Sequence, residues 1–280
     1  MLEPYLRDDA FLSDVALACQ QTDSLHLYWL GQSGFLILWQ GSALLIDPYL
    51  SDSLTKKYAN TDKPHVRMTE RVIDPGRLDF ITAVTSSHNH TDHLDGETLV
   101  PLMHANPELS IIVPEANRLF AAQRLEVDPD FLVGLTLVDR ASVGPFNIIP
   151  VPAAHEMLDT DENGNHKFHG YIFQVGDWTI YHSGDCIPFA GQAEILRSYP
   201  IDIALLPING RDPGRGVAGN FSGREAVQVA YNCQVGLVIP MHYDMFEFNT
   251  VTPDEFIQTC GEMKQAYQIL RNGERISFPA

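Results

Sequence analysis

The chain has 280 residues, of which 45% are hydrophobic, and it carries a formal net charge of −18 at pH 7. Nucleic acids and anionic membrane surfaces are bound by basic faces, so a chain this acidic is not expected to bind either of them. The same charge is compatible with divalent cations, whereas an anionic small-molecule substrate would need a local basic pocket.

Length and cysteine usage narrow the class further. We expect a single domain over residues 1–280, with homo-oligomerisation left open. No apolar run reaches the roughly 18 residues of a transmembrane helix, and the first residues lack the basic and then apolar layout of a secretory signal, which predicts a cytoplasmic protein. The four cysteines are far apart and form no Cys-x-x-Cys pair, so neither a disulfide framework nor a thiolate zinc site is indicated.

The first part of the chain predicts a short helix followed by strands. An amphipathic pattern at 10–20 favours a helix, and apolar runs at 25–30, 35–39 and 43–46 favour strands. The turn signal at 40–42 joins the last two runs into a β-hairpin.

A long polar segment at 49–67 comes next. It contains Lys56, Lys57, His65 and Arg67 and shows no strong periodicity. Long loops in compact domains tend to be functional, so we expect this segment to be a lid over a site.

The remainder of the chain alternates strands and helices, which is typical of βαβ units. A β-branched run at 80–85 predicts a buried strand, and Ser222-Gly223-Arg224-Glu225 is a capping box that predicts the start of a helix. Other strands are expected at 111–113, 135–138, 147–151, 170–175, 178–182, 201–206 and 235–240, with further helices starting near 95, 114 and 252.

Four ligand-type side chains follow the strand at 80–85 within six consecutive positions. His88 and His90 are two residues apart and can point the same way in an extended chain, so they can hold one ion. Asp92 and His93 are adjacent, and adjacent side chains diverge. This division favours two ions, each using part of the motif, as in paired-metal sites that share one attacking water.

Three later strands each end in another candidate ligand, namely His155, Asp185 and His242. Because a metal ion needs about four donors, we assign three terminal ligands to each ion and let the two oxygens of Asp185 bridge them. The first ion takes His88, His90 and His155, and the second takes Asp92, His93 and His242. Asp47 ends the strand at 43–46 and is interpreted as an acceptor that fixes the tautomer of a ligand imidazole, although a simple turn residue is the alternative.

The sequence His-Asn-His-Thr-Asp-His at 88–93, followed by His155, Asp185 and His242, resembles the ordered motifs of the metallo-β-lactamase superfamily over residues 47–242. The resemblance implies an α/β protein with a four-layered α/β/β/α sandwich and metals at one rim of its two sheets. The residues by themselves support a mixed α/β fold with ligands at strand ends.

Residues 206–212 (Leu-Pro-Ile-Asn-Gly-Arg-Asp) and 239–246 (Ile-Pro-Met-His-Tyr-Asp-Met-Phe) resemble the L-ascorbate-6-phosphate lactonase branch, although this chain is shorter than its typical members. This likeness implies a dinuclear site that opens a sugar-acid lactone. A guanidinium matches phosphate oxygens in a two-pronged geometry, while a solvated loop or simple packing is the alternative role. The candidate substrate-binding residues are Asn209, Arg211, Arg215 and Tyr243.

We therefore expect a metal-dependent hydrolase in which a hydroxide bridging two divalent ions attacks a carbonyl carbon, with Asp92 steering the proton and Asp185 bridging as the catalytic residues. Imidazole and carboxylate donors without thiolate permit zinc, manganese or iron. A phosphodiesterase and a thioester hydrolase are alternatives on the same site. A di-iron redox protein or a non-catalytic metal binder is the alternative from another class, but the former more often has glutamate at the position of His90.

Overall fold

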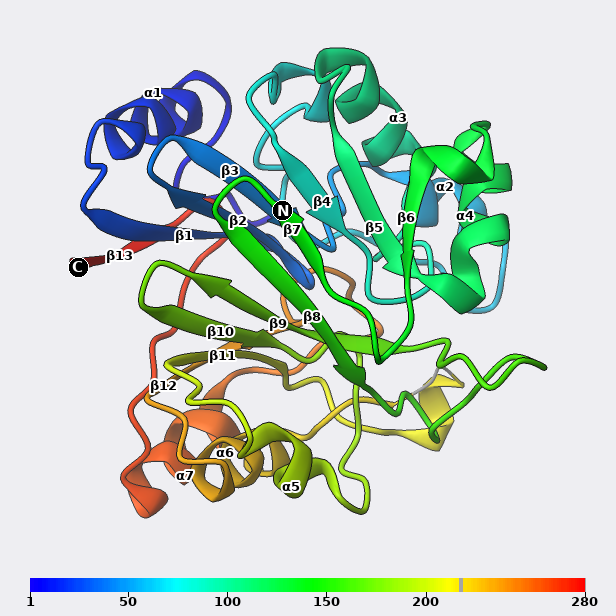
Figure 1. The fold of residues 1–280 in the computed structure, drawn as a ribbon. Helices are drawn as coiled ribbons and strands as arrows, with labels where there is room; N and C mark the ends of the chain where they lie inside the picture. The colour runs from blue at the N-terminus through cyan, green and yellow to red at the C-terminus, as the bar shows by residue number, and fades with distance from the viewer. Residues whose placement is uncertain (217–218, 280) are drawn as a thin grey trace.

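The computed structural model describes residues 1–216 and 219–279. Two β-sheets pack against each other, and helices cover the outer face of each (Figure 1). The four-layered α/β/β/α sandwich expected from the sequence is confirmed.

The first sheet has seven strands within the described residues. Its antiparallel part is formed by β13, β1, β2 and β3, and β3 to β6 pair in parallel. In spatial order the strands are β13 (Arg275–Pro279), β1 (Ser24–Gly31), β2 (Gly34–Trp39), β3 (Ser42–Ile46), β4 (Ala83–Thr85), β5 (Ser110–Pro114) and β6 (Leu132–Leu135). The helices on this side are α1 (Asp8–Cys19), α2 (Ser53–Tyr58), α3 (Gly96–Ala105) and α4 (Arg118–Leu125).

The second sheet has six strands in the described part of the chain. β12, β11 and β10 pair in parallel, and β10, β9, β8 and β7 pair antiparallel. In spatial order they are β12 (Leu237–Met241), β11 (Ile203–Pro207), β10 (Trp178–His182), β9 (His169–Val175), β8 (Phe146–Pro152) and β7 (Ala141–Val143). Its helices are α5 (Gln192–Leu196), α6 (Gly223–Asn232) and α7 (Asp254–Met263), and α6 begins with the predicted capping box.

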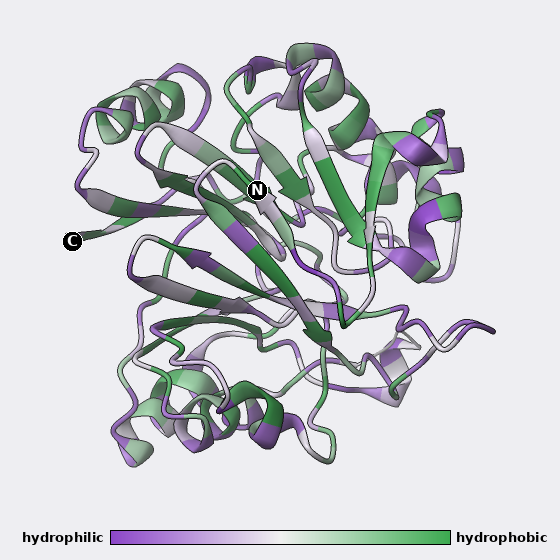
Figure 2. Cartoon of the chain, viewed as in Figure 1, coloured by the Kyte–Doolittle hydropathy of each residue, from purple (hydrophilic) through white to green (hydrophobic). Residues whose placement is uncertain are grey.

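The alternation of side chains along β1 builds two cores at once. Leu27 and Trp29 face the second sheet, whereas Tyr28 and Leu30 face the helices that cover the first sheet. All four are buried, because a strand in the middle of a four-layered protein has no face left for water. Figure 2 shows the strands mostly hydrophobic and the polar residues concentrated on outer helices and loops.

Parallel pairing brings several strand ends to one rim of the sandwich. Ile46 of β3 pairs with Thr85 of β4, and Pro207 of β11 pairs with Met241 of β12. Since neighbouring parallel strands end together, the residues that follow them are brought to the same edge. This rim lies on the right-hand side of Figure 1.

Two sequence expectations differ from the structure. The strand predicted at 135–138 is confirmed only at Leu135, the last residue of β6. Residues 136–138 form a turn, because the Asp139 carboxylate accepts hydrogen bonds from the backbone N–H of Thr136 at 2.9 Å and from the Thr136 hydroxyl at 2.6 Å. The polar segment 49–67 contains the short helix α2.

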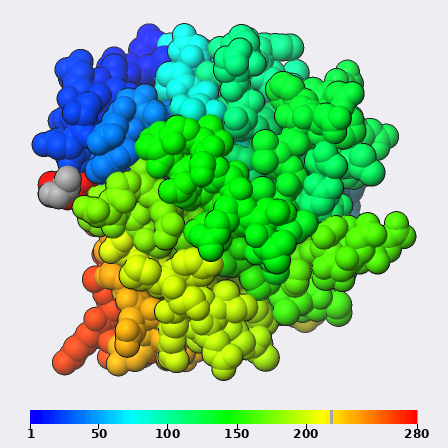
Figure 3. Space-filling view, viewed as in Figure 1, coloured from blue at the N-terminus to red at the C-terminus, as the bar shows by residue number. Residues whose placement is uncertain are grey.

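Loop 153–168, at whose tip Thr160 and His166 form an isolated bridge, projects beside the rim (Figures 1 and 3). Among the described residues, no helix combines the length and apolarity needed to cross a bilayer.

Candidate metal centre

The seven predicted ligands meet at the rim, and both sheets contribute to them. Four come from the segment after β4, where the backbone N–H groups of His93 and Leu94 donate to the carbonyl of His90 and wind the chain into one turn. The other three follow β8, β10 and β12. The complete set is His88, His90, Asp92, His93, His155, Asp185 and His242.

Asp185 lies at the centre of the cluster. Its Oδ1 is 3.3 Å from Nε2 of His93, and its Oδ2 is 3.4 Å from Nε2 of both His155 and His242. A carboxylate within reach of imidazoles from both halves of the site matches the bridging position expected for it.

In the described part of the chain there are three groups of donor residues, and within each group the donor atoms lie within 4.8 Å of one another. Two of them are the triads expected from the sequence, and the third links the triads through Asp185. The groups are His88, His90 and His155; Asp92, His93 and His242; and His88, His93 and Asp185.

The donor atoms of this cluster fit metal ions. Nε2 of His88, Nε2 of His93 and Oδ1 of Asp185 are buried and have no hydrogen-bond partner among the described residues. Leaving such atoms unpaired is costly, and cations coordinated by these atoms would remove that cost. Nitrogen and carboxylate oxygen donors suit zinc, manganese or iron.

Unusual backbone conformations place three residues at the rim. Asp47 and His242 have φ values of 40° and 65°, in the left-handed region that non-glycine residues rarely adopt. Gly184, with φ of 59°, precedes Asp185, and a Cβ there would come within 2.8 Å of Cβ of Ser87. Strain of this kind concentrates at functional sites, where the surrounding structure holds it.

Hydrogen bonds fix which nitrogen of an imidazole faces the cluster. Nδ1–H of His93 donates to Oδ2 of Asp47 at 2.6 Å, and Asp47 also accepts from the Ser87 backbone N–H at 2.8 Å. Nδ1–H of His155 donates to the carbonyl of Gly219 at 2.9 Å. In the neutral imidazole both contacts keep the proton on Nδ1 and make Nε2 the ligand atom, so Asp47 makes the contact expected of it from the sequence.

Burial and charge prepare the donors for a cation. Burial opposes ionisation of Asp185, but the imidazoles of His242 and His93 outweigh it and hold the pKa of Asp185 well below its ordinary value. Burial lowers the pKa of His88 well below its ordinary value, and His93 and His90 lower it further. Burial also disfavours a charged His93, yet the carboxylates of Asp185 and Asp92 raise its pKa well above the ordinary value. Metal binding would therefore release a proton from His93.

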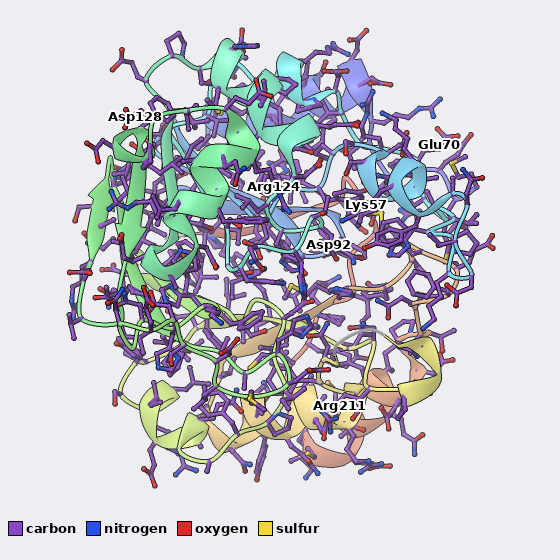
Figure 4. All side chains as sticks on the ribbon, turned by 90° about the vertical axis from the view of Figure 1, so that its right-hand side faces the viewer. Lys57, Glu70, Asp92, Arg124, Asp128 and Arg211 are labelled. Carbon is purple, nitrogen blue, oxygen red and sulfur yellow. The ribbon has the colours of Figure 1, made fainter. Side chains whose placement is uncertain are left out.

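The cluster forms the floor of a cavity of about 510 Å³. One wall is aromatic, with His65 stacked on Tyr58 at 4.3 Å between ring centroids and edge-on to Phe246 at 5.1 Å. Figure 4 shows Lys57 and Arg124 on either side of Asp92. Five of the ligands line the cavity, namely His90, Asp92, His155, Asp185 and His242, together with Gln32, Leu54, Lys57, Tyr58, His65, Asn89, Thr91, Phe120, Arg124, Asn220, Phe246 and Asn249.

The four candidate substrate-binding residues are not part of this lining. Arg211 is paired with Glu225 of the capping box, and Arg215 donates to the carbonyl of Asn209 at 2.5 Å. Tyr243 packs against Trp29 and donates its hydroxyl to a backbone carbonyl. Arg211 accordingly lies well below Asp92 in Figure 4. Asn209 and Arg215 donate to Oδ1 of Asn249, which does line the cavity, at 3.0 Å and 3.2 Å. The contact of the four residues with substrate stays a prediction.

Sequence reasoning missed Gln32, Arg124 and Asn249, which the fold brings into the cavity. Gln32 follows β1 directly, as the ligands follow their strands, and this position was the available signal. Arg124 and Asn249 come from α4 and from the loop after β12, and no local pattern distinguishes them.

The fold and the metal-binding cluster together define a protein of the metallo-β-lactamase fold. A family model described as a β-lactamase superfamily domain matches residues 26–242, which is most of the chain. A metal-dependent hydrolase of the UPF0173 family from Pyrococcus horikoshii is 30% identical over 253 residues, covering 89% of this chain and 98% of the relative. The chain belongs to the metallo-β-lactamase superfamily and, within it, to the UPF0173 family of metal-dependent hydrolases.

Solved structures agree on the fold. An isothiocyanate hydrolase from Delia radicum gut bacteria superimposes with a TM-score of 0.71 at 18% identity, covering 91% of this chain and all of that chain (100%). The metallo-β-lactamase fold protein YhfI from Bacillus subtilis gives 0.66 at 17% identity, with coverages of 91% and 100%. At these identities the likeness concerns the fold alone.

Proposed function

We propose that this metal-dependent hydrolase opens the lactone ring of an anionic sugar acid, such as a phosphorylated one, by attack of water on the carbonyl carbon. The observation that carries the proposal is a cavity with the His and Asp cluster as its floor and two cations at its walls. Ions held by the two triads would supply an activated water and stabilise the developing oxyanion.

The composition of the cavity supports water as the nucleophile. No serine or cysteine lines it within the described residues. Cys186, next to the bridging aspartate, is buried, and burial raises the pKa of its thiol to about 12. The side chain therefore stays a neutral thiol and is not a nucleophile. Asp92 lines the cavity, and burial opposes its ionisation, but His93 and His242 outweigh burial and hold its pKa below the ordinary value, so a charged carboxylate is present to accept a hydrogen bond from the attacking water.

The cations of the cavity support an anionic substrate. Within residues 1–216 and 219–279, Lys57 forms no ion pair, whereas its neighbour Lys56 is paired with Glu97 at 2.7 Å. Arg124 donates Nη1 to the carbonyls of Asn89 and Leu94, both at 2.8 Å, which fixes its guanidinium at the rim. In a protein of net charge −18, two cations facing one cavity form the local basic pocket that an anion requires.

Size and resemblance are the two grounds for proposing a lactone. A cavity of about 510 Å³ lies within the usual range for small-molecule ligands. The two stretches that resemble the lactonase branch lie side by side, because Leu206 of β11 pairs with Pro240 of β12.

A substrate panel tests the proposal. The zinc- and manganese-loaded proteins would be assayed on a phosphorylated sugar lactone, its unphosphorylated form, a phosphodiester, a thioester and an isothiocyanate. We expect the highest kcat/KM for the phosphorylated lactone. A higher value for the phosphodiester or the thioester would replace lactone opening by that reaction, and redox activity without hydrolysis would place the chain among the di-iron proteins.

The charge assignment has matched controls in the chain. Losing a hydrogen-bonding partner of a charged group costs about 1.5–3 kcal/mol, or roughly ten- to a hundredfold in binding. We expect Lys57→Ala to lower kcat/KM by that factor for the phosphorylated lactone alone. Lys56→Ala and Arg211→Ala serve as controls with little effect on either lactone. If Arg211→Ala lowered kcat/KM for the phosphorylated lactone and Lys57→Ala did not, the phosphate-binding role would return to Arg211, as expected from the sequence.

A further inference from the structure

The side chain of Gln32 reaches into one of the two triads. Its Nε2 lies 2.8 Å from Oδ2 of Asp92 and 3.1 Å from Nε2 of His242. Gln32 is only 1% exposed, and its Oε1 has no hydrogen-bond partner among the described residues. A neutral amide therefore touches the donor atoms of two of the three residues that form this triad.

The turn between β1 and β2 is built to hold this amide in place. Gln32 itself has φ of 49°, a conformation that costs a non-glycine residue free energy. Its carbonyl accepts hydrogen bonds from the backbone N–H of His242 at 2.9 Å and from Nε1 of Trp29 at 3.0 Å. The strand end that carries His242 is thus tied to the same residue whose side chain contacts the His242 ring.

The other triad has separate support. Nδ1 of His155 is held by the carbonyl of Gly219, and Nδ1 of His88 lies 3.0 Å from the hydroxyl of Ser87. No hydrogen bond from Gln32 reaches His88, His90 or His155 in the described structure. Any effect of the Gln32 amide on metal binding should therefore be confined to one triad.

We propose that Gln32 is a positioning residue of the metal centre. By donating to Oδ2 of Asp92, its amide holds this carboxylate beside Nε2 of His242 and Nε2 of His93, from which Oδ2 is 3.6 Å and 3.8 Å away. Asp92 is then orientated as a ligand before an ion arrives, and Gln32 sets the affinity of the triad Asp92, His93 and His242. The inference rests on the two-ion site of the proposed function.

Gln32→Met tests the role of the amide, because methionine keeps a similar length and removes the hydrogen-bond donor. Zn²⁺ affinities would be measured on metal-free protein by competition with a chromophoric chelator. Partners that orientate metal ligands typically contribute 10–100-fold to affinity. We expect one dissociation constant to rise by about this factor while the other stays within about twofold.

Two backgrounds assign the weakened ion. In His90→Ala, where the first triad is broken, adding Gln32→Met should still weaken the remaining Zn²⁺ about 10–100-fold. In His242→Ala, where the second triad is broken, the same addition should have little effect. Coupling of this kind distinguishes a role at one triad from general destabilisation, which would act equally in both backgrounds.

Ser33→Ala is the matched control. Ser33 is the next residue of the turn and is buried, and its hydroxyl has no hydrogen-bond partner in the described part of the chain. Ser33→Ala should leave both Zn²⁺ dissociation constants unchanged. Unaltered Zn²⁺ binding in Gln32→Met, or equal weakening in both backgrounds, would overturn the inference. If the wild-type chain bound only one Zn²⁺, the two-ion site would be refuted instead. The Zn²⁺ dissociation constant of Gln32→Met would then still test whether the Gln32 amide strengthens metal binding.

Discussion

Replacing Asp47 by Asn should damage metal binding without touching a metal ligand. The Asp47 carboxylate is completely buried and accepts from the backbone N–H and hydroxyl of Ser87 and from Nδ1–H of His93. An amide oxygen in place of Oδ1 still accepts from the backbone N–H of Ser87, but the NH₂ in place of Oδ2 can accept neither from the Ser87 hydroxyl nor from Nδ1–H of His93. The imidazole must then leave Nδ1–H unpaired or move the proton to Nε2, the atom that faces the cluster.

The structure sets the magnitude of both consequences. A buried donor left without an acceptor costs about 1–3 kcal/mol. At roughly 2–4 °C per kcal/mol, the midpoint of thermal unfolding of the metal-free protein should fall by several degrees. Loss of the partner that orientates a ligand imidazole should weaken metal binding about 10–100-fold.

Calorimetry on metal-free protein and Zn²⁺ competition measure the two effects separately. Asp14→Asn is the control, since Asp14 accepts a hydrogen bond from Tyr28 at 2.7 Å and lies outside the metal centre. It should lower the midpoint without altering Zn²⁺ affinity. If Asp47→Asn also lowered the midpoint and left Zn²⁺ affinity within twofold of wild type, Asp47 would not orientate His93.

Three further predictions concern the cluster. His88→Ala and His242→Ala should each lose about one metal per chain and abolish hydrolysis with the fold intact, and mass spectrometry showing full metal content in either variant would refute the assignment. Asp185→Asn should lose a larger fraction of its activity than of its bound metal, because the amide lacks the negative charge that holds two cations together. Turnover should fall by more than the roughly 10–100-fold that is typical when a residue that only orientates a ligand is replaced. Unchanged turnover would place Asp185 outside the reaction. Burial disfavours a charged His242, but Asp185 and Asp92 outweigh burial and raise its pKa to about 9 in the metal-free protein. Because this pKa lies above the ordinary 6.5, the charged His242 stabilises the folded state fully below about pH 6.5, and this stabilisation is lost as the pH rises through 9. The loss in the free energy of unfolding is up to roughly 3 kcal/mol. Calorimetry should therefore show the unfolding midpoint of metal-free protein falling between pH 6.5 and 9, and a flat profile over that range would contradict the charge assignment.

The ligand cluster could be predicted because its signals are local. Four donors within positions 88–93 form a dense pattern, and the later ligands each follow an apolar run that reads as a strand. The capping box at Ser222 and Glu225 is also local, and both of its hydrogen bonds are present. The layering of the sandwich followed from resemblance, because periodicity places residues on faces but does not say which sheet they will face.

The walls of the cavity could not be predicted because they depend on contacts distant in sequence. Arg211 was expected to bind the substrate, but its guanidinium forms an ion pair with Glu225, 14 residues later. β13 was missed because it is a partly exposed edge strand whose partner is β1, and nothing in its own pattern is strongly apolar. Arg124 could not be assigned either, since its role depends on the carbonyls of Asn89 and Leu94.

The origin of the ligands in both sheets makes any bound ion a fastener between the two halves of the sandwich. His88 and His242 are far apart in the chain, so an unfolded chain cannot gather these donors and the ion binds the folded state selectively. At a free metal concentration 1,000 times the dissociation constant, this linkage contributes about 4 kcal/mol of stability. The lifetime of the protein against heat and proteolysis should therefore lengthen and shorten with the concentration of free metal around it.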